Sequence, residues 1–173
     1  MNAQYGQDRF KKFDQHALKA LQIAHQEAEH RDHHYIGTEH LLLGVINEKD
    51  GKGAQILERL GVSAEQVNKN VERLLSAQRT DHVASNGVVQ WLKGLVRFQL
   101  HKHRGWDAVG LTRRAKKSLE LAVDEARQLH RLQVGTEHLL FGLMSEGGGL
   151  AALVLSELGV SQKTVHDSLR ELG

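Results

Sequence analysis

The stretch Gly37-Thr38-Glu39-His40-Leu41-Leu42 occurs again 98 residues later as Gly135-Thr136-Glu137-His138-Leu139-Leu140. The same shift aligns Leu60-Gly61-Val62-Ser63 with Leu158-Gly159-Val160-Ser161 without a gap. One offset shared by two separate stretches indicates an internal duplication. We therefore divide the chain into an N-terminal tail (1–12), a first copy (13–75), an insert (76–110) and a second copy (111–173).

Each copy has the apolar spacing of short amphipathic helices. Apolar residues recur every three or four positions at the start of the first copy, at Phe13, Ala17, Leu21, Ala24 and Ala28. The chain has no proline and only 5% aromatic residues, which is unlike an all-β domain. We predict an all-α fold, a duplicated four-helix repeat with a longer helical insert between the copies. We expect the two copies to pack together as one domain, because four short helices bury little surface alone.

Several residues predict where helices begin and end. Gly61 and its counterpart Gly159 are expected to end a helix in the left-handed conformation. Ser63 and Gln66 have the spacing of a capping box at the start of the next helix. Thr38 and Thr136 are expected to be the N-caps of the second helix in each copy.

Composition limits the class of protein. The 173 residues include no cysteine, which removes disulfides, cysteine-based zinc sites and thiol nucleophiles. The N-terminus lacks a signal peptide and no apolar run approaches the roughly 18 residues of a membrane span. We expect a cytoplasmic protein without a membrane association.

The sequence offers little for catalysis. It has no phosphate-binding loop, no G-x-S-x-G and no H-E-x-x-H motif, so we expect no enzyme activity and no cofactor. The run 147–149 of three glycines is expected to be a flexible exit from a helix. His30 and His34 could share a helix face as metal ligands, but the second copy has Gln128 and Leu132 there. We therefore expect a solvated histidine-rich helix end and no metal.

The repeated Gly-Thr-Glu-His segment allows two interpretations. In the first, the threonine caps a helix and the glutamate complements the positive helix end, for about 1 kcal/mol or less each. In the second, the helix start attracts an anion while Glu39 or Glu137 accepts hydrogen bonds from a guanidinium or ammonium group. The residues themselves favour the capping interpretation, although they explain the glutamate weakly.

The insert contains a dense apolar stretch, residues 88–100, that includes Trp91 and Phe98. As a helix it would be apolar on more than one face, so something should cover it. It either covers the seam between the copies, which we favour, or docks on a partner protein. Basic residues also lie nearby, but the net charge of only +2 argues against nucleic-acid binding.

The two copies resemble the paired repeats of the N-terminal domain of the Clp/Hsp100 unfoldases, most closely the ClpC type. The matching stretches are Ile36–Gly44, Leu111–Lys117, Glu125–Arg127, Val134–Gly142 and Leu158–Val160. The resemblance implies an all-α double four-helix module that recruits substrates and adaptors. In ClpC-like members it recognises phosphoarginine, a degradation mark, with the glutamate of Gly-Thr-Glu-His taking the guanidinium group.

On that resemblance, Glu39 and Glu137 become guanidinium acceptors, and Thr38, Thr136 and Thr112 join the candidate ligand-binding residues. The family tends to begin the first helix of each repeat with threonine, which is thought to help hold the phosphate. The second copy has Thr112 there, whereas the first has Asp14, whose carboxylate would repel a phosphate. We expect two unequal sites, with the better one involving Thr112 and, within that copy, Glu137.

The unfoldase ATPase modules have no counterpart in this sequence, so we expect a free-standing, non-catalytic recognition module of a Clp proteolytic system. Its partners would be Clp protease or unfoldase components or tagged substrate proteins. The alternative is an accessory subunit that docks through residues 88–100 without recognising phosphate. The sequence does not indicate an oligomeric state.

Overall fold

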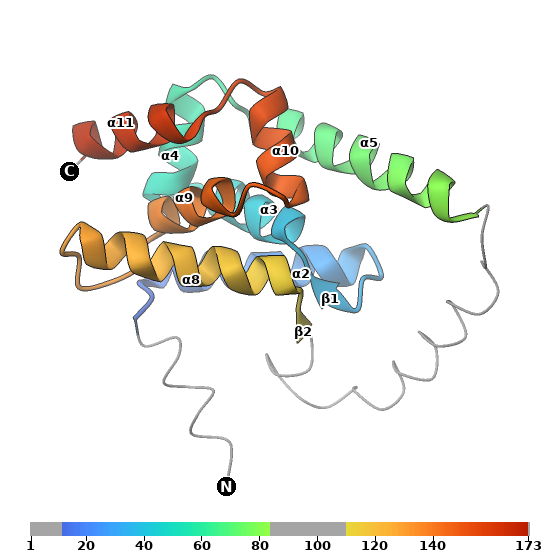
Figure 1. Ribbon diagram of the computed structural model, residues 1–173, viewed down its shortest axis with the longest axis horizontal. Coiled ribbons are helices and arrows are strands. Elements are labelled where there is room, and N and C mark those ends of the chain that lie inside the picture. The colour runs from blue at the N-terminus through green and yellow to red at the C-terminus, as the bar shows by residue number, and fades with distance from the viewer. Residues whose placement is uncertain (1–11, 84–109, 173) are drawn as a thin grey trace, which may run out of the picture.

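The computed structural model describes residues 12–83 and 110–172 of the chain (Figure 1). The described part of the first copy contains α2 (Gln15–His30), β1 (Tyr35–Ile36), α3 (Thr38–Glu48), α4 (Lys52–Arg59) and α5 (Ala64–Val83). The second contains β2 (Gly110–Leu111), α8 (Arg113–Gln128), α9 (Thr136–Glu146), α10 (Leu150–Glu157) and α11 (Gln162–Leu172). The predicted all-α fold with four helices in each copy is confirmed.

The first two helices of each copy cross at a glycine. A Cβ atom on Gly44 of α3 would lie 2.2 Å from the carbonyl oxygen of Ala20 on α2. In the second copy a Cβ atom on Gly142 of α9 would lie 2.2 Å from the carbonyl oxygen of Ser118 on α8. Only glycine allows the helix backbones to approach this closely.

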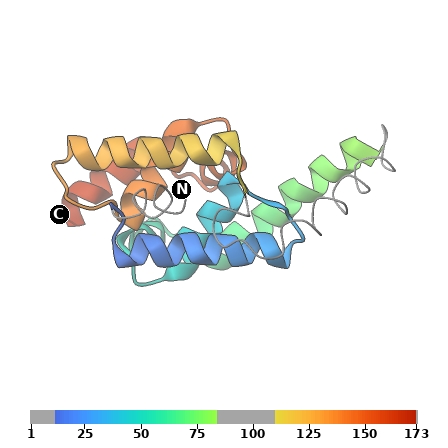
Figure 2. The same ribbon diagram turned by 90° about the horizontal axis from the view of Figure 1, so that it is seen from below.

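Short backbone pairings join the two copies at both ends of the molecule. β1 pairs in parallel with β2, and Thr112 N donates to Ile36 O at 3.0 Å. At the other end Phe13 forms a bridge with Val134, and Asp14 N donates to Val134 O at 3.0 Å. Each copy's first helix therefore begins beside the Gly-Thr-Glu-His segment of the other copy. Figure 2 shows the result, with α2 and α8 along opposite sides of one face.

One hydrophobic core serves both copies. It takes fully buried side chains from both, among them Leu42, Leu43, Ile56, Leu57, Leu140, Leu143 and Leu155. α3 packs against α9 at the centre, while α4 also packs on α9 and α10 on α3. The two repeats therefore share one core.

The predicted glycines after α4 and α10 and the predicted capping box of α5 are confirmed. Gly61 and Gly159 have φ values of 75° and 77°. Ser63 N donates to Gln66 Oε1 at 2.8 Å and Gln66 N donates to Ser63 Oγ at 3.2 Å, which is the capping box.

α5 is longer than the sequence pattern indicated. It continues to Val83, beyond residue 75, where we placed the end of the first copy. No glycine or proline interrupts residues 76–83, and residues such as Gln78 and Arg79 favour a helix. Figure 1 shows α5 extending away from the other helices.

Among the described residues, no single helix is long and apolar enough to cross a membrane. α9 and α10 reach the necessary length and apolar character only as a pair, with a 96° bend between them.

Candidate functional site

The Gly-Thr-Glu-His segments begin α3 and α9, but their threonines are not the N-caps. The N-caps are Gly37 and Gly135, in extended conformation, and Thr38 and Thr136 are already the first helical residues. The prediction that each threonine caps its own helix is therefore wrong. A glycine at the N-cap leaves the threonine hydroxyl free to bond elsewhere.

Each threonine instead caps a helix of the other copy. Thr136 Oγ1 accepts a hydrogen bond from Gly53 N, in the first turn of α4, at 2.9 Å. Thr38 Oγ1 accepts from Ala151 N, in the first turn of α10, at 3.4 Å. Both threonines are at least 97% buried. They satisfy backbone N–H groups that the glycine N-caps of α4 and α10 cannot serve, and so they hold the copies together.

The histidines of the two segments complete the caps of α3 and α9. Gly37 N donates to His40 Nδ1 and Gly135 N donates to His138 Nδ1, both at 2.9 Å. Because Nδ1 is an acceptor, each neutral ring must carry its proton on Nε2. Burial lowers the pKa of His40 to about 3 and is also the main cause that lowers the pKa of His138. Both histidines are therefore structural and neutral.

Glu39 is a buried acidic group next to this cap. Its side chain is 6% exposed and its carboxylate folds back over Gly37, where a Cβ atom would collide with it. Burial raises the pKa of Glu39, although a hydrogen bond from its own backbone N–H, the charge of Arg31 and the Thr38 hydroxyl act in the opposite direction. A carboxylate that has lost most of its water interacts more strongly with a cation than an exposed one does.

Glu39 lines an open cleft of about 680 Å³ between the copies. The other polar residues around it include Thr112, Arg113 and Arg114, at the start of α8. Thr112 is the N-cap of α8, where its Oγ1 accepts from Ala115 N at 3.1 Å. Arg114 lies 3.8 Å from Glu146, at the end of α9. The cleft thus combines one buried carboxylate with a positive helix start and two guanidinium groups.

The cleft corrects the expected pairing of residues. Thr112 shares the cleft with Glu39 of the first copy, whereas we expected it to work with Glu137 of its own copy. Glu137 lies at the opposite end, where Asp14 and Lys52 both act on the charge of the neighbouring His138. The exchange follows from the two backbone pairings, which place each first helix beside the other copy's segment.

The glycine run 147–149 forms part of the cleft wall and is not merely a flexible exit. Gly147 ends α9 in the left-handed conformation, with φ 72°. A Cβ atom on Gly149 would lie 2.4 Å from Thr38 Oγ1, and one on Gly148 would lie 3.0 Å from an Arg114 guanidinium nitrogen. These glycines let the loop approach Thr38 and Arg114 closely.

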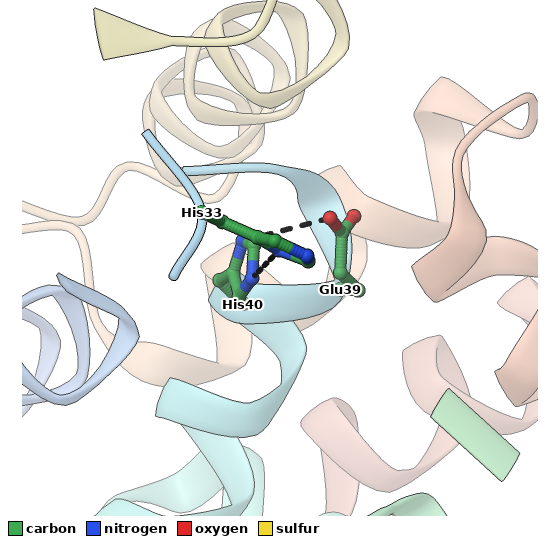
Figure 3. Close-up of side chains that lie close together, drawn as sticks. All are labelled: His33, Glu39 and His40. Carbon is green, nitrogen blue, oxygen red and sulfur yellow. Dashed lines mark hydrogen bonds and ion pairs between the residues drawn. The ribbon is translucent and has the colours of Figure 1, made fainter. Parts of the chain in front are cut away.

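His33, Glu39 and His40 form a cluster whose potential ligand atoms lie within 4.8 Å of one another (Figure 3). His33 Nδ1 lies 2.9 Å from His40 Nε2. A histidine that binds a metal through Nε2 normally donates a hydrogen bond from its Nδ1–H group. His40 Nδ1 instead accepts a hydrogen bond from Gly37 N. His40 Nε2 therefore carries a proton and donates it to His33. The donor set does not fit a metal ion.

Two of the predicted residues, Trp91 and Phe98, lie outside the described residues, so the docking role of residues 88–100 stays a prediction. The sequence reasoning missed Arg113, Arg114 and Tyr35 as cleft residues. The signal was available for the arginines, because they follow Thr112 directly. Tyr35 gave no signal, since its neighbourhood depends on the pairing of β1 with β2.

Comparison with known proteins identifies the repeat. Residues 12–97 and 110–172 match the family described as the Clp repeat (R) N-terminal domain. The chain is 38% identical over 163 residues to the negative regulator of genetic competence ClpC/MecB of Bacillus subtilis (strain 168), which covers 94% of this chain. It is 35% identical to the chaperone protein ClpB of Oceanobacillus iheyensis, and this match also covers 94% of the present chain. It spans only 17% of the length of each of these relatives.

A solved structure has the same fold. The N-terminal domain of the chaperone ClpD from Arabidopsis thaliana matches with a TM-score of 0.65 and 21% sequence identity, covering 94% of this chain and 96% of the other. The repeat, the arrangement of helices and the family match agree. The chain belongs to the Clp repeat N-terminal domain family.

Proposed function

We propose that this domain is a non-catalytic recognition module of a Clp proteolytic system and that it binds phosphoarginine-marked proteins in the Glu39 cleft. The observation that carries the proposal is the presence of Glu39 and Thr112 in one cleft. Phosphoarginine has a guanidinium group next to a phosphoryl group, and the cleft offers a carboxylate for the first and cationic groups for the second. A guanidinium group paired with a carboxylate and a phosphate placed at a helix N-terminus are both favourable contacts.

Burial of Glu39 strengthens this assignment. Its raised pKa records the cost of keeping a carboxylate with little water around it. A guanidinium ligand would replace the lost water with charge-assisted hydrogen bonds, so this carboxylate gains more from a cation than an exposed one. The capping interpretation does not require such burial, because a glutamate near a helix start can act from the surface.

The other end of the molecule, with Glu137 and Asp14, is expected to contribute little to phosphoarginine binding. Asp14 occupies the position of Thr112, and its Oδ1 accepts from Ala17 N at 2.7 Å as the N-cap of α2. Aspartate and threonine therefore both act as N-caps, but only aspartate brings a negative charge to the position expected for the phosphate. With about 16 non-hydrogen atoms at about −0.3 kcal/mol each, free phosphoarginine would bind one site at a Kd of about 0.3 mM.

Calorimetry with phosphoarginine and plain arginine tests the proposal. We expect one site per chain for phosphoarginine, an affinity at least tenfold lower after Glu39→Gln, and little change after Glu137→Gln. Thr112→Asp should abolish binding and Asp14→Thr should raise the stoichiometry toward two, while far-UV circular dichroism stays unchanged. Saturable binding that survives both Glu39→Gln and Thr112→Asp would contradict the proposed site, and no binding up to millimolar phosphoarginine would contradict the function.

A further inference from the structure

The Glu39 cleft has an apolar side that phosphoarginine itself would not use. Tyr35 and Leu153 line it, together with Leu150 and Ala152. Tyr35 remains 42% exposed and Leu153 47% exposed, which makes them two of the five exposed large hydrophobic residues in the described part of the chain. A solvated face of this kind at a binding cleft indicates contact with a further apolar group. We call these four residues the apolar wall.

Tyr35 is held in place from the other side. Its ring stacks on His33, with ring centres 5.3 Å apart and planes 13° from parallel. It also meets the buried His40 ring edge-on at 6.1 Å. Because His40 is fixed by Gly37 N, the aromatic part of the apolar wall is anchored to the same cap that positions Glu39.

The Glu137 end of the molecule provides an internal comparison, because it lacks most of this wall. The shift of 98 residues places Gln133 at the position of Tyr35, Lys52 at that of Leu150 and Gln55 at that of Leu153. Lys52 acts on the charge of His138, so it does lie near Glu137. Core positions such as Leu42 and Leu140 agree between the copies, whereas these positions around the two glutamates differ.

We propose that the apolar wall selects phosphoarginine residues that are flanked by an apolar side chain in the bound polypeptide. This inference rests on the proposed function, since it names the sequence context that the same cleft prefers. The polar end fixes the modified arginine, so the neighbouring residue of the same polypeptide lies within reach of the wall, one residue spacing of about 3.8 Å away. Burying an aliphatic side chain there removes apolar surface of both molecules from water. A free amino acid would gain nothing from this contact.

Three short phosphoarginine peptides on the intact protein test the preference. They differ only in the residues on both sides of phosphoarginine, which are leucine, glycine or aspartate. We expect the leucine-flanked peptide to bind about tenfold more tightly than the glycine-flanked one, which corresponds to burying roughly 55 Å² of apolar surface. The aspartate-flanked peptide tests the competing idea that Arg113 and Arg114 attract acidic residues next to phosphoarginine.

Leu153→Gln, which copies Gln55 of the first repeat, should remove most of the preference and leave the glycine-flanked affinity unchanged. Gln55→Leu is the matched control on the exposed surface of α4. It should change neither the preference for the leucine-flanked peptide nor the affinity for the glycine-flanked peptide. Equal binding of the leucine and glycine peptides, tighter binding of the aspartate peptide, or a preference that survives both Leu153→Gln and Tyr35→Gln would overturn the inference while the proposed function stands. Failure of the glycine-flanked peptide to bind at all would instead count against the proposed function.

Discussion

Burial gives the acidic and the imidazole group of the first Gly-Thr-Glu-His segment different roles. Glu39 keeps a raised pKa because burial disfavours its charge, and a cationic ligand can relieve that cost. His40 is buried next to Glu39, and its Nδ1 accepts a hydrogen bond from Gly37 N. This hydrogen bond requires a neutral imidazole ring. Glu39 can therefore still bind a cationic ligand, whereas His40 is part of the helix cap.

The neutral histidines predict a loss of stability in mild acid. The pKa of His40 is 6.5 ordinarily and about 3 in the folded protein, so the unfolded chain binds more protons between these values. The His40 contribution is fully present above pH 6.5 and is lost as the pH falls towards 3. From pH 7 to pH 5 the free energy of unfolding should fall by about 2 kcal/mol on account of His40. Urea titrations at several pH values measure this.

The difference between the protein and a His40→Gln variant isolates the effect. Glutamine at this position can still accept the N–H of the N-cap residue but does not titrate, so the variant should depend less on pH. His30→Gln, on the exposed end of α2, is the control for removing a histidine outside the cap. His16 acts in the opposite direction, because the hydrogen bond to Glu48 raises its pKa, but it is common to all three proteins. Parallel pH curves for the protein and His40→Gln would contradict the assignment.

The helix caps of α4 and α10 depend on the other copy. Thr136→Val keeps the shape of the side chain but removes the acceptor for Gly53 N, which is buried. We expect a loss of about 1–2 kcal/mol in the free energy of unfolding by urea titration. Thr136→Ser keeps the hydroxyl group and should restore most of that loss.

Thr38→Val is the comparison at the other end. Its contact with Ala151 N is longer, at 3.4 Å, so its loss should be smaller than that of Thr136→Val. Equal stability of Thr136→Val and the unchanged protein would show that water satisfies Gly53 N and that the threonine is not needed as a cap.

The sequence predicted the local features of the helices but not the exchange between copies. Gly61 and the Ser63–Gln66 pair were found because turn and cap chemistry acts over a few neighbouring residues. The partner of Thr136 lies 83 residues away in the sequence, and no local pattern identifies it. For the same reason Thr112 was assigned to the wrong glutamate: the choice depends on how two similar units face each other.

The whole molecule should fold as one cooperative unit. The copies share a core, two backbone pairings and two exchanged caps. We expect peptides covering residues 12–83 and 110–172 to show little helix by circular dichroism when separate, and to regain it when mixed. A fragment that is fully helical and melts cooperatively on its own would contradict this view.

The exchanged caps have a consequence for how such a protein can arise and change. A single repeat unit would need a second, identical chain to supply its threonine, and a symmetric dimer would impose every substitution on both sites at once. Joining two units in one chain removes that constraint. One end can then carry Thr112 with Tyr35 and Leu153, while the other carries Asp14 with Gln133 and Gln55. Two copies in one chain can therefore diverge independently at the two ends, as the pairs Thr112/Asp14 and Leu153/Gln55 do.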